Sequence, residues 1–86
     1  MIKKELMYIL KSEIRLYIIL SLNEYPKSPK ELSSKQFYIS HISNNLKDLI
    51  EKEYVICITP DLRKNKKFAL TEKSENLIKD LKELIE

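Results

Sequence analysis

The chain has 86 residues, with 16 basic and 13 acidic side chains and a formal net charge of +3. This length predicts one domain and is too short for a two-domain enzyme, a barrel or a full doubly wound sheet. The sequence contains no glycine and a single cysteine, so it excludes glycine-rich phosphate loops, dinucleotide-binding fingerprints and an intrachain disulfide.

Residues 2–24 are rich in leucine, isoleucine and tyrosine and lack proline. Ser12 is a good N-cap and Glu13 follows it, so we expect the main helix of this segment to begin there. Its apolar residues cover nearly all faces, which is typical of a helix buried on several sides. In so small a domain, we expect this helix to meet a partner subunit as well as the core. We expect residues 6–10 to form one or two earlier helical turns, either continuous with this main helix or separate from it.

A short second helix is predicted over Pro29–Lys35. Ser28 is a suitable N-cap, and Pro29 stands at the first helical position, where its missing N–H costs nothing. Glu31 follows Ser28 by three residues and completes a capping-box pattern. Leu32 is the expected inward anchor of this helix.

The segment Ile39–Glu53 carries the most informative pattern. Apolar residues recur at helical spacing on one face: Ile39, Ile42, Leu46, Leu49 and Ile50. The opposite face is polar: Ser40, His41, Asn44, Lys47, Asp48 and Glu51. A helix that recognises base edges needs short hydrogen-bonding side chains at its N-terminal end, and this segment has them. His41 is open to two interpretations, a base contact or an ordinary surface residue.

Two strands are predicted over Tyr54–Thr59 and Phe68–Thr71, because the first is β-branched and aromatic and Pro60-Asp61 starts a turn. The loop of this hairpin carries four cations: Arg63, Lys64, Lys66 and Lys67. Thr71 is the expected N-cap of a last helix. The apolar stripe of that helix consists of Leu77, Ile78, Leu81, Leu84 and Ile85.

Charge is unevenly distributed along the chain. Residues 27–70 hold nine basic and five acidic side chains, whereas residues 71–86 hold three basic and five acidic ones. A basic centre suits a polyanionic partner, although a solvated surface is the alternative. No run of 18 apolar residues is present, so we expect no membrane-spanning segment. The first residues do not read as a signal peptide, so we expect a cytoplasmic location, and binding to a nucleic acid would make it nucleoid-associated.

The order of elements predicts a mainly α fold with a small β-hairpin. A short and a longer helix joined by a tight turn form a helix-turn-helix, and a basic hairpin directly after them is a wing. In such a unit the second helix enters the major groove with its N-terminal residues on base edges. The hairpin then reaches phosphates or the adjacent minor groove.

Four segments in this order resemble winged-helix repressors of the ArsR and MarR type. SEIRLYIILSL is similar to their first helix, PKEL to the start of their second, SHISNNLKDLIEKEYVI to their recognition helix and first wing strand, and KKFALTEKSENLIKDL to their second wing strand and C-terminal helix. Glu53 stands where these proteins usually have a glycine. The composition also resembles that of archaeal proteins.

The resemblance implies a homodimeric, DNA-binding transcriptional regulator with a single winged helix-turn-helix domain over residues 1–86 (order α-α-α-β-β-α). The expected recognition-helix contacts are Ser40, His41, Asn44, Asn45 and Lys47. The expected backbone contacts near the turn are Lys30, Lys35 and Tyr38. The wing contacts are Arg63, Lys64, Lys66 and Lys67. Extra terminal helices, including a dimerisation helix over 72–86, would form the interface through Ile18, Leu77, Leu81, Leu84 and Ile85.

Two other functions stay open at this point. One is an architectural, chromatin-type protein that coats or bridges DNA with little sequence preference. The other is a protein-interaction winged helix that no longer binds DNA. An enzyme is not expected, because the acids and lysines fall on solvated helix faces. We expect no cofactor, no metal and no small-molecule ligand, and either a dimer or a tetramer.

Overall fold

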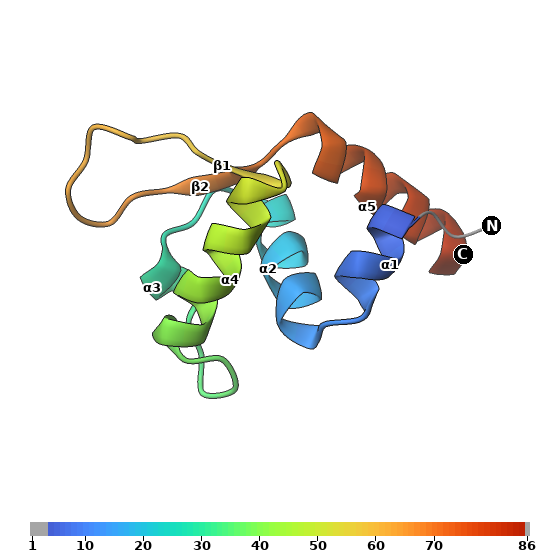
Figure 1. Cartoon of the computed structure of the whole chain (residues 1–86), viewed down its shortest axis with the longest axis horizontal. Coiled ribbons are helices and arrows are strands. Elements are labelled where there is room, and N and C mark those ends of the chain that lie inside the picture. The colour runs from blue at the N-terminus through green and yellow to red at the C-terminus, as the bar shows by residue number, and fades with distance from the viewer. Residues whose placement is uncertain (1–3, 86) are drawn as a thin grey trace.

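The computed structural model describes residues 4–85 and is mainly helical, with one antiparallel two-stranded sheet (Figure 1). The elements in chain order are α1 Lys4–Leu10, α2 Glu13–Glu24, α3 Pro29–Leu32, α4 Ile39–Glu51, β1 Val55–Cys57, β2 Phe68–Leu70 and α5 Glu72–Ile85. The predicted helix-rich fold with a hairpin is therefore confirmed. None of the helices within residues 4–85 has the length and apolar character needed to cross a membrane.

Side-chain caps fix where three of the helices begin. The hydroxyls of Ser12, Ser28 and Thr71 each accept a hydrogen bond from the amide three residues later, at 3.4, 3.2 and 3.4 Å. Glu31 returns the interaction in α3, because its carboxylate accepts a hydrogen bond from the Ser28 amide at 3.0 Å. These contacts satisfy amides that a helix cannot pair internally, and they lie at the predicted starts.

Helix α3 is shorter than predicted and ends at Leu32. The Ser33 amide donates to the Pro29 carbonyl at 2.9 Å and closes the last turn. A tight turn follows, in which the Ser34 amide donates to the Phe37 carbonyl at 2.9 Å and the Phe37 amide donates to Ser34 Oγ at 3.1 Å. This turn replaces the remaining predicted helical residues and connects α3 to α4.

Helix α4 ends two residues earlier than predicted because Glu53 adopts a left-handed conformation, with φ of 66°. The Glu53 amide donates to the Ile50 carbonyl at 3.0 Å, and the Tyr54 amide donates to the Leu49 carbonyl at 2.8 Å. This pair of bonds is a Schellman motif, which usually places glycine at the left-handed position. The motif turns the chain directly into β1.

The hairpin pairs Val55 with Leu70, Ile56 with Ala69 and Cys57 with Phe68. A hydrogen bond of 3.0 Å from the Ile58 amide to the Lys67 carbonyl continues the ladder toward the loop. On its other edge, β2 forms an isolated bridge between Phe68 and Lys27, the residue just before the N-cap of α3. The sheet therefore ties the loop connecting α2 and α3 to the base of the hairpin.

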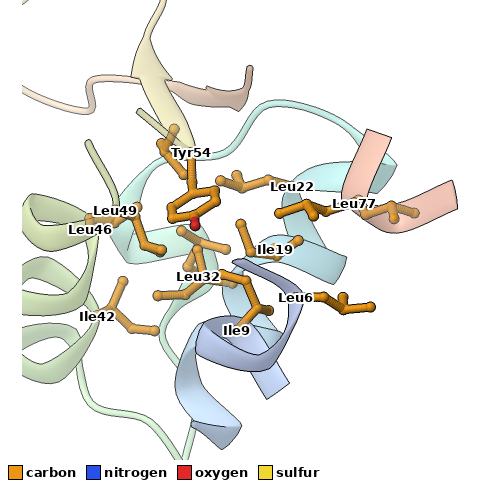
Figure 2. Close-up of a cluster of buried hydrophobic side chains, with 13 residues drawn as sticks. Leu6, Ile9, Ile19, Leu22, Leu32, Ile42, Leu46, Leu49, Tyr54 and Leu77 are labelled. Carbon is orange, nitrogen blue, oxygen red and sulfur yellow. The ribbon is translucent and has the colours of Figure 1, made fainter. Parts of the chain in front are cut away.

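One core receives side chains from all five helices and from the start of β1 (Figure 2). Its buried members are Leu6, Ile9, Ile18, Ile19, Leu22, Leu32, Ile42, Leu46, Leu49, Tyr54, Val55, Leu77 and Ile78. Two hydroxyls bridge the elements around it: Tyr17 donates to the Leu32 carbonyl and Ser74 to the Tyr54 carbonyl, both at 2.6 Å. The core thus holds α3 and α4 in a defined position against α2.

The terminal helices contribute to this core, which corrects part of the predicted dimer interface. Ile18 and Leu77 are 0% and 5% exposed, so neither has surface with which to contact a partner. Figure 1 shows α1 and α5 side by side against α2. Leu81 is half-buried against the same core, and Leu84 is 53% exposed. The side chain of Ile85 lies outside the described part of the chain.

Candidate nucleic-acid interface

The polar face of α4 is open to solvent along its N-terminal half. Ser40, His41 and Asn44 are all exposed, and Lys47 is exposed one turn further on. The helix is held in place from its other side by Ile42, Leu46 and Leu49, at 0%, 2% and 0% exposure. A rigidly anchored helix therefore presents short hydrogen-bonding side chains outward.

Asn45 differs from the other predicted contacts of α4. It is half-buried, and its side-chain amide donates to the His41 carbonyl at 2.9 Å. It also borders a shallow groove between α4 and the start of α2, together with Ser12 and Glu13. Because one of its donors is used within the helix and it faces α2, Asn44 is better placed than Asn45 for an external contact.

The start of α4 lacks the side-chain cap that α2 and α3 have. Its N-cap residue is Tyr38, which makes no side-chain capping hydrogen bond. The Tyr38 side chain is 65% exposed, and its ring centroid lies 6.5 Å from that of His41. The unpaired N–H groups at the start of a helix carry partial positive charge and donate hydrogen bonds to anions such as phosphate. This end of α4 is therefore electrostatically suited to a polyanion.

Further cations lie on α3, in the turn before α4 and in the β1–β2 loop. Lys30 on α3 and Lys35 in the turn before α4 are exposed. In the loop between β1 and β2, Arg63 and Lys64 are exposed and Lys66 is half-buried. Among the side chains described, no carboxylate forms an ion pair with any of these five residues.

The β1–β2 loop projects from the body of the molecule, on the side where α3 and α4 lie (Figure 1). Asn65 takes a left-handed conformation in it, with φ of 57°, which asparagine tolerates better than most residues. The projection places the cations of this loop beyond the surface of the helices. They can therefore contact a large partner that also touches α4.

Lys67 is the exception among the loop cations, because its ammonium group forms an ion pair with Glu31 of α3. This hydrogen bond, together with that from the Ser28 amide, lowers the pKa of Glu31 from 4.5 to about 2. Lys67 therefore supports the position of the hairpin against α3. Its charge is already partly neutralised, in contrast to Arg63 and Lys64.

Acidic residues limit the extent of the candidate surface. Asp48 and Glu51 are exposed on the C-terminal half of α4. Like charges repel a polyanion, so the part of this helix from its start to Lys47 suits one better than the last turn does. The helix would then approach its partner end-first rather than along its whole length.

The sequence pattern misses one exposed residue of this surface. Ile39 belongs to the apolar stripe of α4 and is expected to be buried, yet it is 50% exposed. Helical spacing identifies the face of a residue but not where the neighbouring elements end. The packing that buries Ile42 and Leu46 leaves Ile39, in the first turn, half exposed.

Comparisons of the chain with models of protein families, with curated proteins and with solved structures found no match. The arrangement of exposed polar and cationic side chains around α4 is therefore what indicates a function.

Proposed function

We propose that this protein is a sequence-specific double-stranded DNA-binding regulator of transcription, with a winged helix-turn-helix domain. In this proposal α3 and α4 are the helix-turn-helix, α4 is the recognition helix, and the β1–β2 hairpin is the wing. The observation that carries it is the exposure of Ser40, His41 and Asn44 on a helix whose other face is anchored in the core.

The dimensions and chemistry of α4 support this use. A helix fits into the major groove, which is about 12 Å wide, and its N-terminal residues then meet base edges. Asn44 can make two hydrogen bonds to adenine, and Ser40 is a tolerant donor and acceptor. His41 can donate or accept, depending on its tautomer.

Contacts to the DNA backbone would come from the surrounding cations. Lys30 lies on α3, Lys35 in the turn before α4, Lys47 about two turns into α4, and Arg63, Lys64 and Lys66 in the projecting loop. Such contacts set the orientation of a protein on the duplex and supply most of its salt-dependent affinity. The unpaired amides at the start of α4 suit a further phosphate.

We propose that the regulator binds as a homodimer, with two recognition helices in successive major grooves about 34 Å apart. Leu84, which is 53% exposed near the end of α5, and the half-buried Leu81 are the described residues of the predicted interface that still have free surface. Light scattering measures the oligomeric state. If the protein is strictly monomeric in solution, the proposed dimer is wrong and each molecule would bind a single half-site.

The test of the function is selection of bound duplexes from a random pool, followed by measurement of affinity for the selected and random duplexes at physiological salt. A regulator predicts a ratio of about 10³ or more. A small ratio with strong salt dependence would favour an architectural protein instead. Absence of salt-dependent binding to any duplex would refute DNA binding altogether.

A further inference from the structure

Ile39 is the first residue of α4 and is half exposed, unlike the buried members of its stripe. Its side chain is 50% exposed, whereas Ile42 and Leu46 are 0% and 2% exposed. The residues that follow it, Ser40 and His41, are exposed and polar. An apolar, β-branched side chain therefore stands at the edge of the surface proposed to meet base pairs.

Base edges in the major groove offer one apolar group, the 5-methyl group of thymine. We infer that Ile39 contacts this methyl group in bound DNA and thereby selects an A·T pair at one position of the site. This inference rests on the proposed function, because it assigns a specificity-determining role to a residue of the same helix. Burial of the methyl group against Ile39 would remove apolar surface of both partners from water.

The surroundings of Ile39 distinguish this role from an apolar protein contact. A site for a protein partner is expected to be a contiguous apolar patch. On α4 the other exposed apolar side chain is Ile50, which is 39% exposed and lies 11 residues away, about 16 Å along the helix axis. Between them the exposed face is polar and charged. The neighbouring Tyr38 is also exposed, at 65%, but its ring ends in a hydroxyl group. An apolar side chain among hydrogen-bonding groups matches the mixed chemistry of a base pair.

The experiment replaces each thymine of the selected duplex in turn by uracil, which lacks only the 5-methyl group. Affinities of the wild-type protein and of Ile39→Ala are measured at one fixed salt concentration. For the wild type, one replacement is expected to weaken binding about three- to fivefold, the effect of one buried methyl group. Ile39→Ala is expected to bind the thymine and uracil duplexes equally well at that position.

Two further variants keep the test independent of folding. Ile39→Val retains a branched apolar side chain and should preserve most of the preference for thymine. Ile50→Ala removes a comparable exposed isoleucine from the far end of α4 and should leave the preference unchanged. Circular dichroism melts of the three variants check that each is folded.

The outcomes separate this inference from the proposed function. A preference for thymine that persists in Ile39→Ala, or tight binding by the wild type with no sensitivity to any uracil, would overturn the role of Ile39 while DNA recognition stands. Failure to enrich any duplex from the pool would overturn sequence-specific recognition and this inference together.

Discussion

Glu31 and Lys67 form an ion pair that joins α3 to the end of the β1–β2 loop, although 36 residues separate them. The same Glu31 oxygen accepts a hydrogen bond from the Ser28 amide at 3.0 Å. One carboxylate therefore closes the capping box of α3 and positions the hairpin beside it. This contact fixes the hairpin next to α3, on the side of the molecule where α4 also lies (Figure 1).

Acid should weaken the fold through Glu31. Its pKa is lowered from 4.5 to about 2, chiefly by the hydrogen bond from Lys67 and then by that from the Ser28 amide. A carboxylate with a depressed pKa in the folded state stabilises the fold fully above its unfolded pKa, and this stabilisation is lost as the pH falls through the folded value. We expect Glu31→Gln to flatten the fall in melting temperature between about pH 4.5 and 2. Glu83→Gln, which removes an exposed carboxylate on α5, is the control. An equal effect of the two substitutions on the melting temperature would contradict the role of Glu31 in acid sensitivity.

Salt dependence of DNA binding should distinguish the loop cations from one another. Arg63→Ala and Lys64→Ala should each reduce the slope of log affinity against log salt by about 0.9 for every phosphate that the side chain neutralises in the wild type. Lys67→Ala should change the slope less, because its charge is paired with Glu31. Lys79→Ala, an exposed lysine on α5, should leave the slope unchanged. Unaltered slopes in the Arg63 and Lys64 variants would remove the loop from the interface.

Glycine at position 53 should stabilise the protein. Glu53 holds a φ of 66° in the Schellman motif that ends α4. A left-handed conformation costs a residue with a Cβ atom about 1–2 kcal/mol, whereas glycine adopts it freely but loses more entropy on folding. We expect Glu53→Gly to raise the free energy of unfolding in urea by about 0.5–1 kcal/mol. Asp48→Gly, at an exposed position in the interior of α4, should instead lower it by about 1 kcal/mol.

The packing of the short helix α3 against the core should depend on the side chain of Leu32. Leu32 is its buried residue, at 0% exposure, and the Tyr17 hydroxyl binds its carbonyl. We expect Leu32→Ala to cost about 2–5 kcal/mol of unfolding free energy, as is typical of large-to-small changes in a core. Leu62→Ala, which truncates a leucine of the β1–β2 loop that is 48% exposed, should cost less than about 0.5 kcal/mol. A destabilisation of similar size in both variants would contradict the described core.

Local signals in the sequence predict most of the elements. Ser12, Ser28 with Glu31, and Thr71 mark helix starts that the structure confirms, because a cap involves residues only three positions apart. The helix end at Glu53 is harder to place, since the left-handed residue there is not a glycine. Strands β1 and β2 form the predicted hairpin, but each strand is shorter than predicted.

Features that depend on contacts distant in sequence are not predictable from the pattern. The burial of Ile18 within its own chain depends on how the other elements of the core pack around α2, which helical spacing does not specify. The pairing of Lys67 with Glu31 depends on where the hairpin lies relative to α3. For the same reason the spacing places Ile39 on the correct face of α4 but does not reveal its exposure.

The most direct test of base recognition by α4 is the change in DNA specificity caused by Asn44→Ala, measured as affinity for the selected duplex and for random DNA. We predict that binding to the selected duplex weakens by about 1–3 kcal/mol and that binding to random DNA changes little, because a base contact carries sequence information and a phosphate contact does not. Asn76→Ala, the same change at an exposed position of α5, should alter neither affinity. Equal weakening on both duplexes, or none on either, would contradict recognition of bases by α4.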